Sequence, residues 1–310
     1  MLKHSRGLQD YKPWFTHDSE NPAQGSIKVT FLGVTTLLID DGETQLLIDG
    51  FFSRHSLWKV VTSQMHTNRK KADNAISKYE ISRVKAIFVS HSHYDHAFDV
   101  AYVTQITGAV LHGSQSTLNI GRGGGLGEKQ MAAFQPGKEI QIGAFSITVI
   151  PAKHSPPSFF NNNIGQTIDW PLSQPARVIK YVEGNSYDFL IKHAGKSIYI
   201  IPSANYVQGM RDQYKADVVF LSIGNIARLN MAVKNAIWEN SIEKLKPSLI
   251  IPIHWENFFT PLSSNLQMFP PIIDKTENSF DFIIEKCQEQ NLDLKMLQGG
   301  RSVVLFKKQH

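Results

Sequence analysis

One stretch decides the fold of this 310-residue chain: Lys85-Ala86-Ile87-Phe88-Val89-Ser90, followed directly by His91-Ser92-His93-Tyr94-Asp95-His96. The first six residues form the short apolar run that a buried strand needs, and the next six place three imidazoles and one carboxylate in the loop leaving it. Imidazole nitrogen and carboxylate oxygen are ligands for a borderline-soft divalent cation. A chance match to this spacing occurs on the order of once per thousand chains. The stretch therefore predicts a metal site rather than a solvated polar loop.

Two further histidines end apolar runs in the same way. His154 follows the segment 147–153, and His254 follows Leu249-Ile250-Ile251-Pro252-Ile253. Taken alone, a histidine at a strand end is more often structural than a ligand. Because strand ends converge at one edge of a sheet, the motif at 91–96 turns both into candidate ligands.

The rest of the chain alternates strand-like and helix-like patterns, which is typical of helices layered on sheets and predicts the α/β class. A β-meander opens the domain, and two comparable halves follow. Predicted strands lie at 27–32, 36–40, 45–49, 85–90, 109–112, 139–142, 145–150, 187–192, 197–201, 217–223 and 248–253, and predicted helices at 71–80, 97–107 and about 232–245.

Domain organisation follows from the same patterns. Residues 1–26 are polar with scattered aromatics and are predicted to form an N-terminal extension on the domain surface. Residues 27–306 are predicted to form a single α/β domain. A polar, proline-rich segment at about 155–177 has no clear period and is predicted to be an inserted functional loop.

Composition limits the functional classes. The chain is 42% hydrophobic and 19% charged, with a formal net charge of +5, yet its longest basic block is Arg69-Lys70-Lys71. No nucleic-acid partner is expected from so mild an excess. The single cysteine, Cys287, cannot form an intramolecular disulfide or any cysteine-based zinc site.

Membrane and targeting signals are weak. No transmembrane segment is predicted, since no run approaches the roughly 20 apolar residues of a membrane span. The N-terminus carries no apolar signal-peptide core, which predicts a cytoplasmic protein, or a periplasmic one if a leader has been removed.

The chain resembles the metallo-β-lactamase superfamily over about residues 27–306. The resemblance rests on Thr30-Phe31-Leu32-Gly33, Leu47-Ile48-Asp49-Gly50, the motif at 91–96, His154, and Pro252-Ile253-His254-Trp255. It is similar above all to the broad branch with ascorbate-phosphate lactonases and N-acyl phosphatidylethanolamine phospholipases D. The resemblance implies a four-layer αβ/βα sandwich with metals at one edge between the halves.

The same resemblance implies two ligand groups. His91, His93 and His154 would hold one ion, and Asp95, His96 and His254 the other. Zn²⁺ is the expected cofactor, as one or two ions, with Mn²⁺ or Fe²⁺ as alternatives.

One position departs from the family pattern. Many relatives have a bridging aspartate after the strand at 197–201, whereas this chain has Ser203. A hydroxyl is a poor ligand beside a carboxylate, so the second ion is expected to bind more weakly than the first. Asp49 is a candidate for orienting a ligand histidine, with an ordinary turn aspartate as the alternative.

The expected chemistry is hydrolysis of an ester, lactone, amide or phosphodiester by metal-activated hydroxide. Asp95 is the candidate catalytic residue, because it could orient the hydroxide and take its proton. Two alternatives stay open: a catalytically silent binding protein, and an iron-dependent redox enzyme. His93 disfavours the redox alternative, because flavodiiron relatives have a glutamate there. A small-molecule or lipid-like substrate is expected, and neither its identity nor the oligomeric state follows from the sequence.

Several other features lie outside the motif and the ligand groups. The glycine-rich segment 121–127 matches no phosphate-binding pattern and is predicted to be a flexible loop near the site mouth. His112 and His193 are predicted not to be ligands. The aromatic candidates for lining a substrate pocket are Phe159, Phe160, Trp170 and Trp255.

Overall fold

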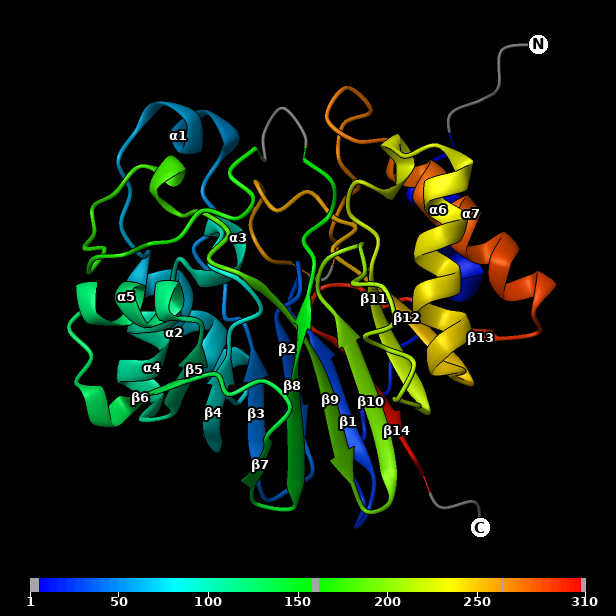
Figure 1. Ribbon diagram of the computed structural model, residues 1–310, viewed down its shortest axis with the longest axis horizontal. Coiled ribbons are helices and arrows are strands. Elements are labelled where there is room, and N and C mark those ends of the chain that lie inside the picture. The colour runs from blue at the N-terminus through cyan, green and yellow to red at the C-terminus, as the bar shows by residue number, and fades with distance from the viewer. Residues whose placement is uncertain (1–5, 158–161, 264, 308–310) are drawn as a thin grey trace.

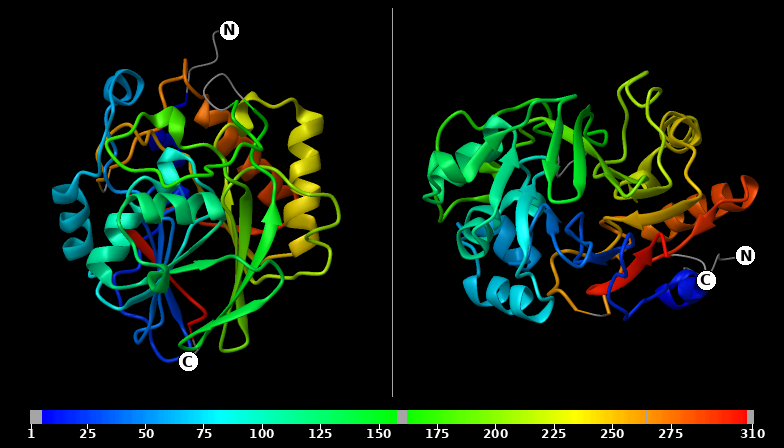
Figure 2. Two further views of the ribbon diagram at one scale, coloured as in Figure 1. Left: turned by 60° about the vertical axis from the view of Figure 1, so that its left-hand side comes forward. Right: turned by 90° about the horizontal axis from the view of Figure 1, so that it is seen from below.

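Two seven-stranded sheets face each other at the centre of the molecule (Figure 1). The structure is a computed structural model that describes residues 6–157, 162–263 and 265–307. Helices lie on the outer side of each sheet in both side views (Figures 1 and 2). This confirms the predicted α/β class and the four-layer αβ/βα sandwich.

The first sheet has the order β14-β1-β2-β3-β4-β5-β6. Its strands are β1 (Ile27–Phe31), β2 (Leu37–Asp40), β3 (Gln45–Ile48), β4 (Val84–Phe88), β5 (Val110–Gly113), β6 (Met131–Ala133) and β14 (Arg301–Leu305). Strands β1 to β3 form the predicted antiparallel meander, and β3 to β6 run parallel. Parallel strands end at the same edge, so the loop after β4 opens there.

The second sheet has the order β13-β12-β11-β10-β9-β8-β7. Its strands are β7 (Glu139–Ile142), β8 (Phe145–Ala152), β9 (Ser186–His193), β10 (Lys196–Ile201), β11 (Val218–Ser222), β12 (Leu249–Ile253) and β13 (Asp293–Leu294). Strands β7 to β10 pair antiparallel, and β10 to β13 parallel. The loops after β8, β10 and β12 carry the predicted positions 154, 203 and 254.

The α-helices are α1 (Leu57–Thr62), α2 (Arg69–Lys78), α3 (Tyr94–Ala97), α4 (Val100–Thr107), α5 (Gln115–Gly123), α6 (Met231–Trp238) and α7 (Thr276–Glu289). Short 3-10 turns are η1 (Leu8–Trp14), η2 (Glu128–Gln130), η3 (Val178–Lys180) and η4 (Ile226–Arg228), and η5 (Glu239–Glu243) is a π-helix. Helices α2, α4 and α5 lie outside the first sheet, and α6 and α7 outside the second (Figure 1).

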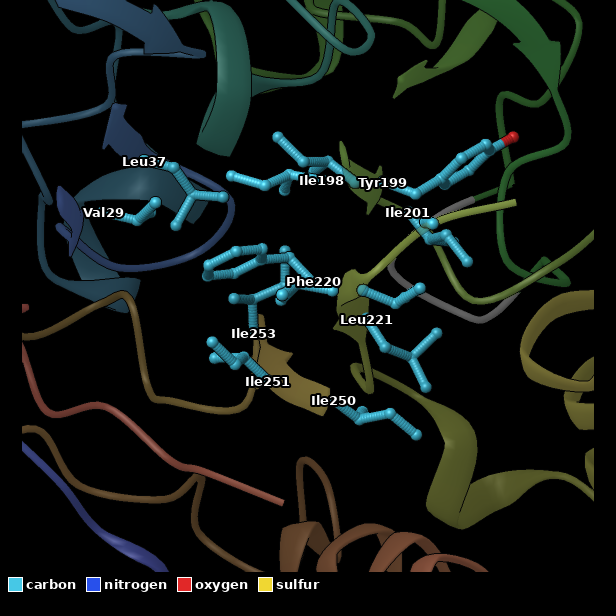
Figure 3. Packing of buried hydrophobic residues seen from close by; sticks show 14 of the residues in the cluster. Val29, Leu37, Ile198, Tyr199, Ile201, Phe220, Leu221, Ile250, Ile251 and Ile253 are labelled. Carbon is cyan, nitrogen blue, oxygen red and sulfur yellow. The ribbon is translucent and has the colours of Figure 1, made fainter. Parts of the chain in front are cut away.

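Apolar side chains fill the space between the two sheets. Figure 3 shows Val29 and Leu37 of the first sheet pointing toward Ile198, Phe220 and Ile253 of the second. All five belong to one buried cluster and are at most 3% exposed. Burying a side chain of this size stabilises the fold by about 1.5–3 kcal/mol. The packed sheets therefore give rigid support to the loops at their shared edge.

The helix predicted near 232–245 is confirmed, because α6 continues through the π-helical turn η5 and helical structure runs to Leu245. The helix predicted at 97–107 differs from the structure. It begins earlier, as the single turn α3, and restarts at Val100. Hydrophobic period alone does not distinguish a continuous helix from two segments with a break.

The prediction for the glycine-rich segment is wrong. Gly121 and Gly123 belong to the end of α5, whose N-cap Ser114 accepts a hydrogen bond from the Thr117 backbone N–H. A Cβ on Gly123 would lie 2.1 Å from the Leu172 carbonyl oxygen. The missing side chain thus lets the end of α5 lie against the backbone of Leu172. None of the segment's residues lines the cavity at the candidate site.

The N-terminal residues pack on the second half of the chain. Tyr11 is buried, its ring lies 4.8 Å from that of Phe280 in α7, and its hydroxyl donates to Asp281 Oδ1 at 2.9 Å. The domain boundary at residue 27 stays a prediction. Within the described residues, every helix is too short or too polar to cross a bilayer.

Candidate metal centre

The motif at 91–96 spans the short loop between β4 of the first sheet and helix α3, and most of that helix. Strand β4 ends at Phe88, and one short helix, α3, begins at Tyr94. The loop residue His93 is extended, with φ −62° and ψ 158°, which ends the strand direction before the helical turn. Asp95 and His96 therefore lie on a helical turn directly after the extended His93. The short spacing of the motif thus keeps its four candidate ligands in one loop and its following turn.

His154, which follows β8 in the opposite sheet, completes a first group with His91 and His93. One candidate ligand atom from each lies within 4.8 Å of the others. The ring of His154 lies 4.7 Å from that of His91 and 4.7 Å from that of His93. Two of these imidazoles come from the loop after β4 and the third from the loop after β8. Three imidazoles facing one point form a donor arrangement that Zn²⁺ favours.

The second ring nitrogens of this group are held by neighbours. His93 Nε2 donates to the Asn163 side-chain oxygen at 2.8 Å, and His91 Nδ1 lies 3.2 Å from Ser90 Oγ. His154 Nδ1 lies 3.0 Å from the Ser155 carbonyl oxygen. Such contacts fix which nitrogen carries the proton and leave the other lone pair for a cation. His91 Nε2 is buried without a hydrogen-bond partner among the described residues, which fits a metal ligand.

Asp95, His96 and His254 form the second group, again with ligand atoms within 4.8 Å of one another. Asp95 Oδ2 lies 3.3 Å from His254 Nε2 and 3.5 Å from His96 Nε2. His96 Nδ1 donates to Asp49 Oδ2 at 2.7 Å. Asp49, which is fully buried, also accepts from the Ser90 backbone N–H at 2.7 Å. Asp49 thus contacts a candidate ligand in the way that its predicted orienting role requires.

Two residues that sequence reasoning missed support His254. This histidine has a left-handed backbone, with φ 58°, and its N–H donates to the Val34 carbonyl at 2.8 Å. Glu256 accepts from the Val34 N–H and from Arg54 Nη2, each at 2.7 Å. Arg54 and Glu256 are completely buried. Glu256 lies two residues after a candidate ligand, which was a usable signal, whereas nothing in the sequence marks Arg54 or Asn163.

The electrostatics keep the rings of the first group neutral and the Asp95 carboxyl of the second group ionised. Burial lowers the pKa of His154 to about 3 and holds the pKa of His91 well below its usual value, so both rings are neutral. Burial opposes ionisation of Asp95, but neighbouring His96 and His254 outweigh it and lower the pKa of the carboxyl. Neutral imidazoles and an ionised carboxylate are the forms that coordinate metals.

Ser203 lies beside the first group, after β10. Its hydroxyl accepts a hydrogen bond from the Ser155 backbone N–H at 2.8 Å, and Ser203 lines the same cavity as all six candidate ligands. The cavity has a volume of about 590 Å³. That volume suits a small organic substrate.

Two other histidines, His112 and His193, lie outside both ligand groups. His112 stacks on Phe88 with ring centroids 4.7 Å apart, and His193 Nε2 lies 3.1 Å from Asp41 Oδ2. Within the described ranges neither residue belongs to a group that could hold a metal, in keeping with their prediction as non-ligands.

Two aromatic predictions are wrong. Trp255 is 1% exposed and packs on Phe15 and Phe280 in the core, because the chain turns at His254 and directs the next side chain inward. Trp170 is 81% exposed and does not line the cavity. Phe159 and Phe160 lie outside the described residues.

Known proteins resemble this chain in sequence and structure. Residues 44–255 match the family model described as a beta-lactamase superfamily domain. A UPF0173 metal-dependent hydrolase of Heliobacterium modesticaldum is 24% identical over 82% of this chain and 92% of its own length. Another, from Carboxydothermus hydrogenoformans, is 23% identical over 90% of this chain and 100% of its own.

Solved structures share the fold. Igni18, a metallo hydrolase of Ignicoccus hospitalis, superimposes with a TM-score of 0.55 and 16% identity, covering 91% of this chain and 100% of its own. CmlA, a diiron β-hydroxylase from Streptomyces venezuelae, gives a TM-score of 0.55 and 11% identity, covering 92% of this chain and 55% of its own. Since these two proteins carry out different chemistry, the fold alone does not decide the reaction.

Proposed function

The chain belongs to the metallo-β-lactamase superfamily, and on that premise we propose that it is a metal-dependent hydrolase of esters, lactones, amides or phosphodiesters. One observation carries the proposal: six side chains from both sheets turn their candidate ligand atoms into one cavity. The named hydrolase relatives support the same reaction class.

We propose Zn²⁺ as the cofactor, with His91, His93 and His154 as ligands of one ion and Asp95, His96 and His254 as ligands of a second. The donor set fits this cofactor. In every one of these histidines except His254, a neighbouring group contacts one ring nitrogen. In addition, His91 Nε2 is buried without a hydrogen-bond partner among the described residues. A bound divalent ion at such a site lowers the pKa of water toward neutrality and polarises the substrate oxygen.

Asp95 is proposed as the catalytic residue. Its Oδ2 lies 3.5 Å from His96 Nε2 and 3.3 Å from His254 Nε2, and the residue lines the cavity. An ionised carboxylate at the cavity can accept the proton that attacking water loses and pass it to the leaving group. Asp49 would hold the His96 ring in the orientation that this transfer needs.

Ser203 is proposed as a weak ligand or a neighbour of the first group. Because it supplies no negative charge, the second ion should dissociate before the first. Elemental analysis after dialysis, with and without a mild chelator, should show a two-step loss of metal.

The test of the function is a hydrolase substrate panel assayed with chelated protein and with added Zn²⁺ or Mn²⁺. Turnover that appears only with metal is expected. A protein that binds no transition metal would refute the proposal. Metal binding without hydrolysis of any substrate would instead favour the silent binding protein, and oxygen consumption with bound iron the redox alternative.

A further inference from the structure

The cavity above the two ligand groups has apolar walls. Two sets of apolar side chains, called walls below, line it: Val60 and Val61 of α1 with Ile179 of η3, and Phe258, Phe269 and Ile273 from the segment after β12. The walls come from separate parts of the chain, so the apolar face of a single helix does not account for them. Apolar walls and polar candidate ligands thus line the same cavity.

The apolar surface reaches the candidate ligands themselves. The ring of Phe258 lies 5.8 Å from the ring of His254, and Phe269 packs edge-on against Phe258 with ring centroids 5.3 Å apart. A molecule whose reactive group lies at the ligands therefore has its next atoms against hydrocarbon. Such a surface is favourable for an apolar chain and unfavourable for a hydrated one.

Apolar side chains also stand open to water at the cavity. Val61 is 54% exposed and Ile179 is 65% exposed. Each would lose contact with water if an apolar chain entered between the walls, which is a source of binding energy. Exposed apolar residues that line a concave site therefore indicate a binding site more strongly than single ones on a convex surface do.

The charge of the cavity is nearly balanced beyond the six candidate ligands. Among the described lining residues, the other ionisable groups of fixed charge are Arg228 and Asp274, whose Nε and Oδ1 lie 3.9 Å apart. Beyond the proposed metal site, the described lining thus offers no cluster of cationic side chains for further phosphate groups. The walls favour a hydrocarbon-rich part of the substrate.

We infer that the substrate is an ester with an acyl chain that lies between these two walls while its carbonyl group meets the ligand groups. The inference rests on the proposed function and specifies its substrate class. In the reaction, oxygen from water bonds to the acyl carbon and the bond from that carbon to the leaving oxygen breaks. The products are a carboxylate, an alcohol and a proton.

The first experiment measures kcat/KM for p-nitrophenyl esters from acetyl to decanoyl, with Zn²⁺-loaded protein and below the critical micelle concentration of each ester. Because burying one methylene is worth about 0.8 kcal/mol, each added methylene should raise kcat/KM about fourfold until the cavity is filled. Equal values for short and long chains would overturn the inference while leaving metal-dependent hydrolysis intact.

Two variants locate the chain. Val61→Glu and Ile179→Glu place a charge on the wall at positions exposed enough for the fold to tolerate it. Each should lower kcat/KM for the octanoyl ester by about tenfold and leave that for the acetyl ester nearly unchanged. Val233→Glu is the matched control, since Val233 is 36% exposed on α6 and does not line the cavity. A chain-length preference that survives both wall variants would also overturn the inference.

A binding measurement separates this inference from the proposed function. Calorimetric titration of the metal-loaded protein should give decanoate at least tenfold tighter binding than acetate, since both carry the same carboxylate. Decanoate could bind more tightly than acetate, and Val61→Glu could abolish that difference, in a protein that has no esterase activity. This outcome would support the apolar site and refute the reaction. Equal binding of the two acids would overturn the apolar site whatever the activity.

Discussion

The two ligand groups share one cavity but differ in charge and in what holds them. The first contains three imidazoles, and its outer contacts go to a serine hydroxyl, a backbone carbonyl and the Asn163 amide. The second contains a carboxylate, and its His96 is held by a second, buried carboxylate, Asp49. The first group is thus neutral, and the second gathers negative charge.

This difference assigns different tasks to neighbouring residues of one motif. Neutral nitrogen ligands leave most of an ion's charge available to polarise water and substrate, and a nearby carboxylate can move protons. The missing carboxylate at Ser203 reduces the negative charge around the second group. We therefore expect changes in the first group to remove metal and activity together, and changes in the second to have graded effects.

The largest effect is expected for His91→Ala. It removes an imidazole from the first group and should abolish both ion binding there and turnover. Elemental analysis and hydrolysis of a verified substrate would check this, with His112→Ala as the control outside both groups. Loss of activity in His112→Ala with full activity in His91→Ala would mean that the site is wrongly assigned.

Asp95→Asn should lower the rate by about 10²-fold or more, because it keeps the shape but loses the charge that takes the proton. The midpoint of urea unfolding should change little, since Asp95 contributes almost no apolar burial. The measurement is kcat on a verified substrate with metal content determined in parallel. Full activity in this variant would remove Asp95 from the catalytic role.

Asn163→Ala should weaken metal binding in the first group by about 10- to 100-fold, because the ring of His93 loses the oxygen that orients it. Competition with a metallochromic chelator measures the affinity. Asn163→Asp, which keeps an acceptor oxygen, should restore most of it. An equal loss of affinity for both ions in Asn163→Ala would contradict the separate roles of the two ligand groups.

Ser203→Asp should raise the affinity for the second ion by about tenfold, because it adds a carboxylate at the edge of the cavity. The same chelator competition checks this, and the first ion should be held as before. An unchanged second affinity would show that Ser203 does not face the second group.

The last prediction concerns His112, a buried histidine at a strand end outside both groups, and it should affect stability but not the metal site. Burial lowers its pKa from 6.5 to about 4, so between these values the unfolded chain takes up a proton that the folded chain does not. The free energy of unfolding therefore falls as the pH drops below 6.5. His112→Gln should reduce this fall by about 2 kcal/mol at pH 5, in urea titrations of metal-free protein at pH 7 and 5. An unchanged pH dependence would contradict the assigned pKa.

Much of the fold could be predicted because its signals are local. The apolar run that becomes β4, the meander at β1 to β3 and the hairpin of β7 and β8 appear in the sequence within one or two residues of their observed bounds. The break between α3 and α4 was not predicted, because no proline or glycine marks it. It falls at Asp99, the N-cap of α4, whose buried carboxylate accepts hydrogen bonds from Phe52 and Ser53, residues far away in the sequence.

The sequence by itself determined the chemistry at 91–96, because four donors within six residues must share one loop. Only the tertiary structure brought His154 and His254 to that loop, since these contacts join strand ends that are far apart along the chain. It also decided that Asn163 meets His93, that Arg54 and Glu256 support the turn at His254, and that Trp255 points into the core. Such contacts depend on how the two sheets pack face to face. The hydrophobic pattern of a sequence predicts single helices and strands, but it does not show which distant residues this packing brings together.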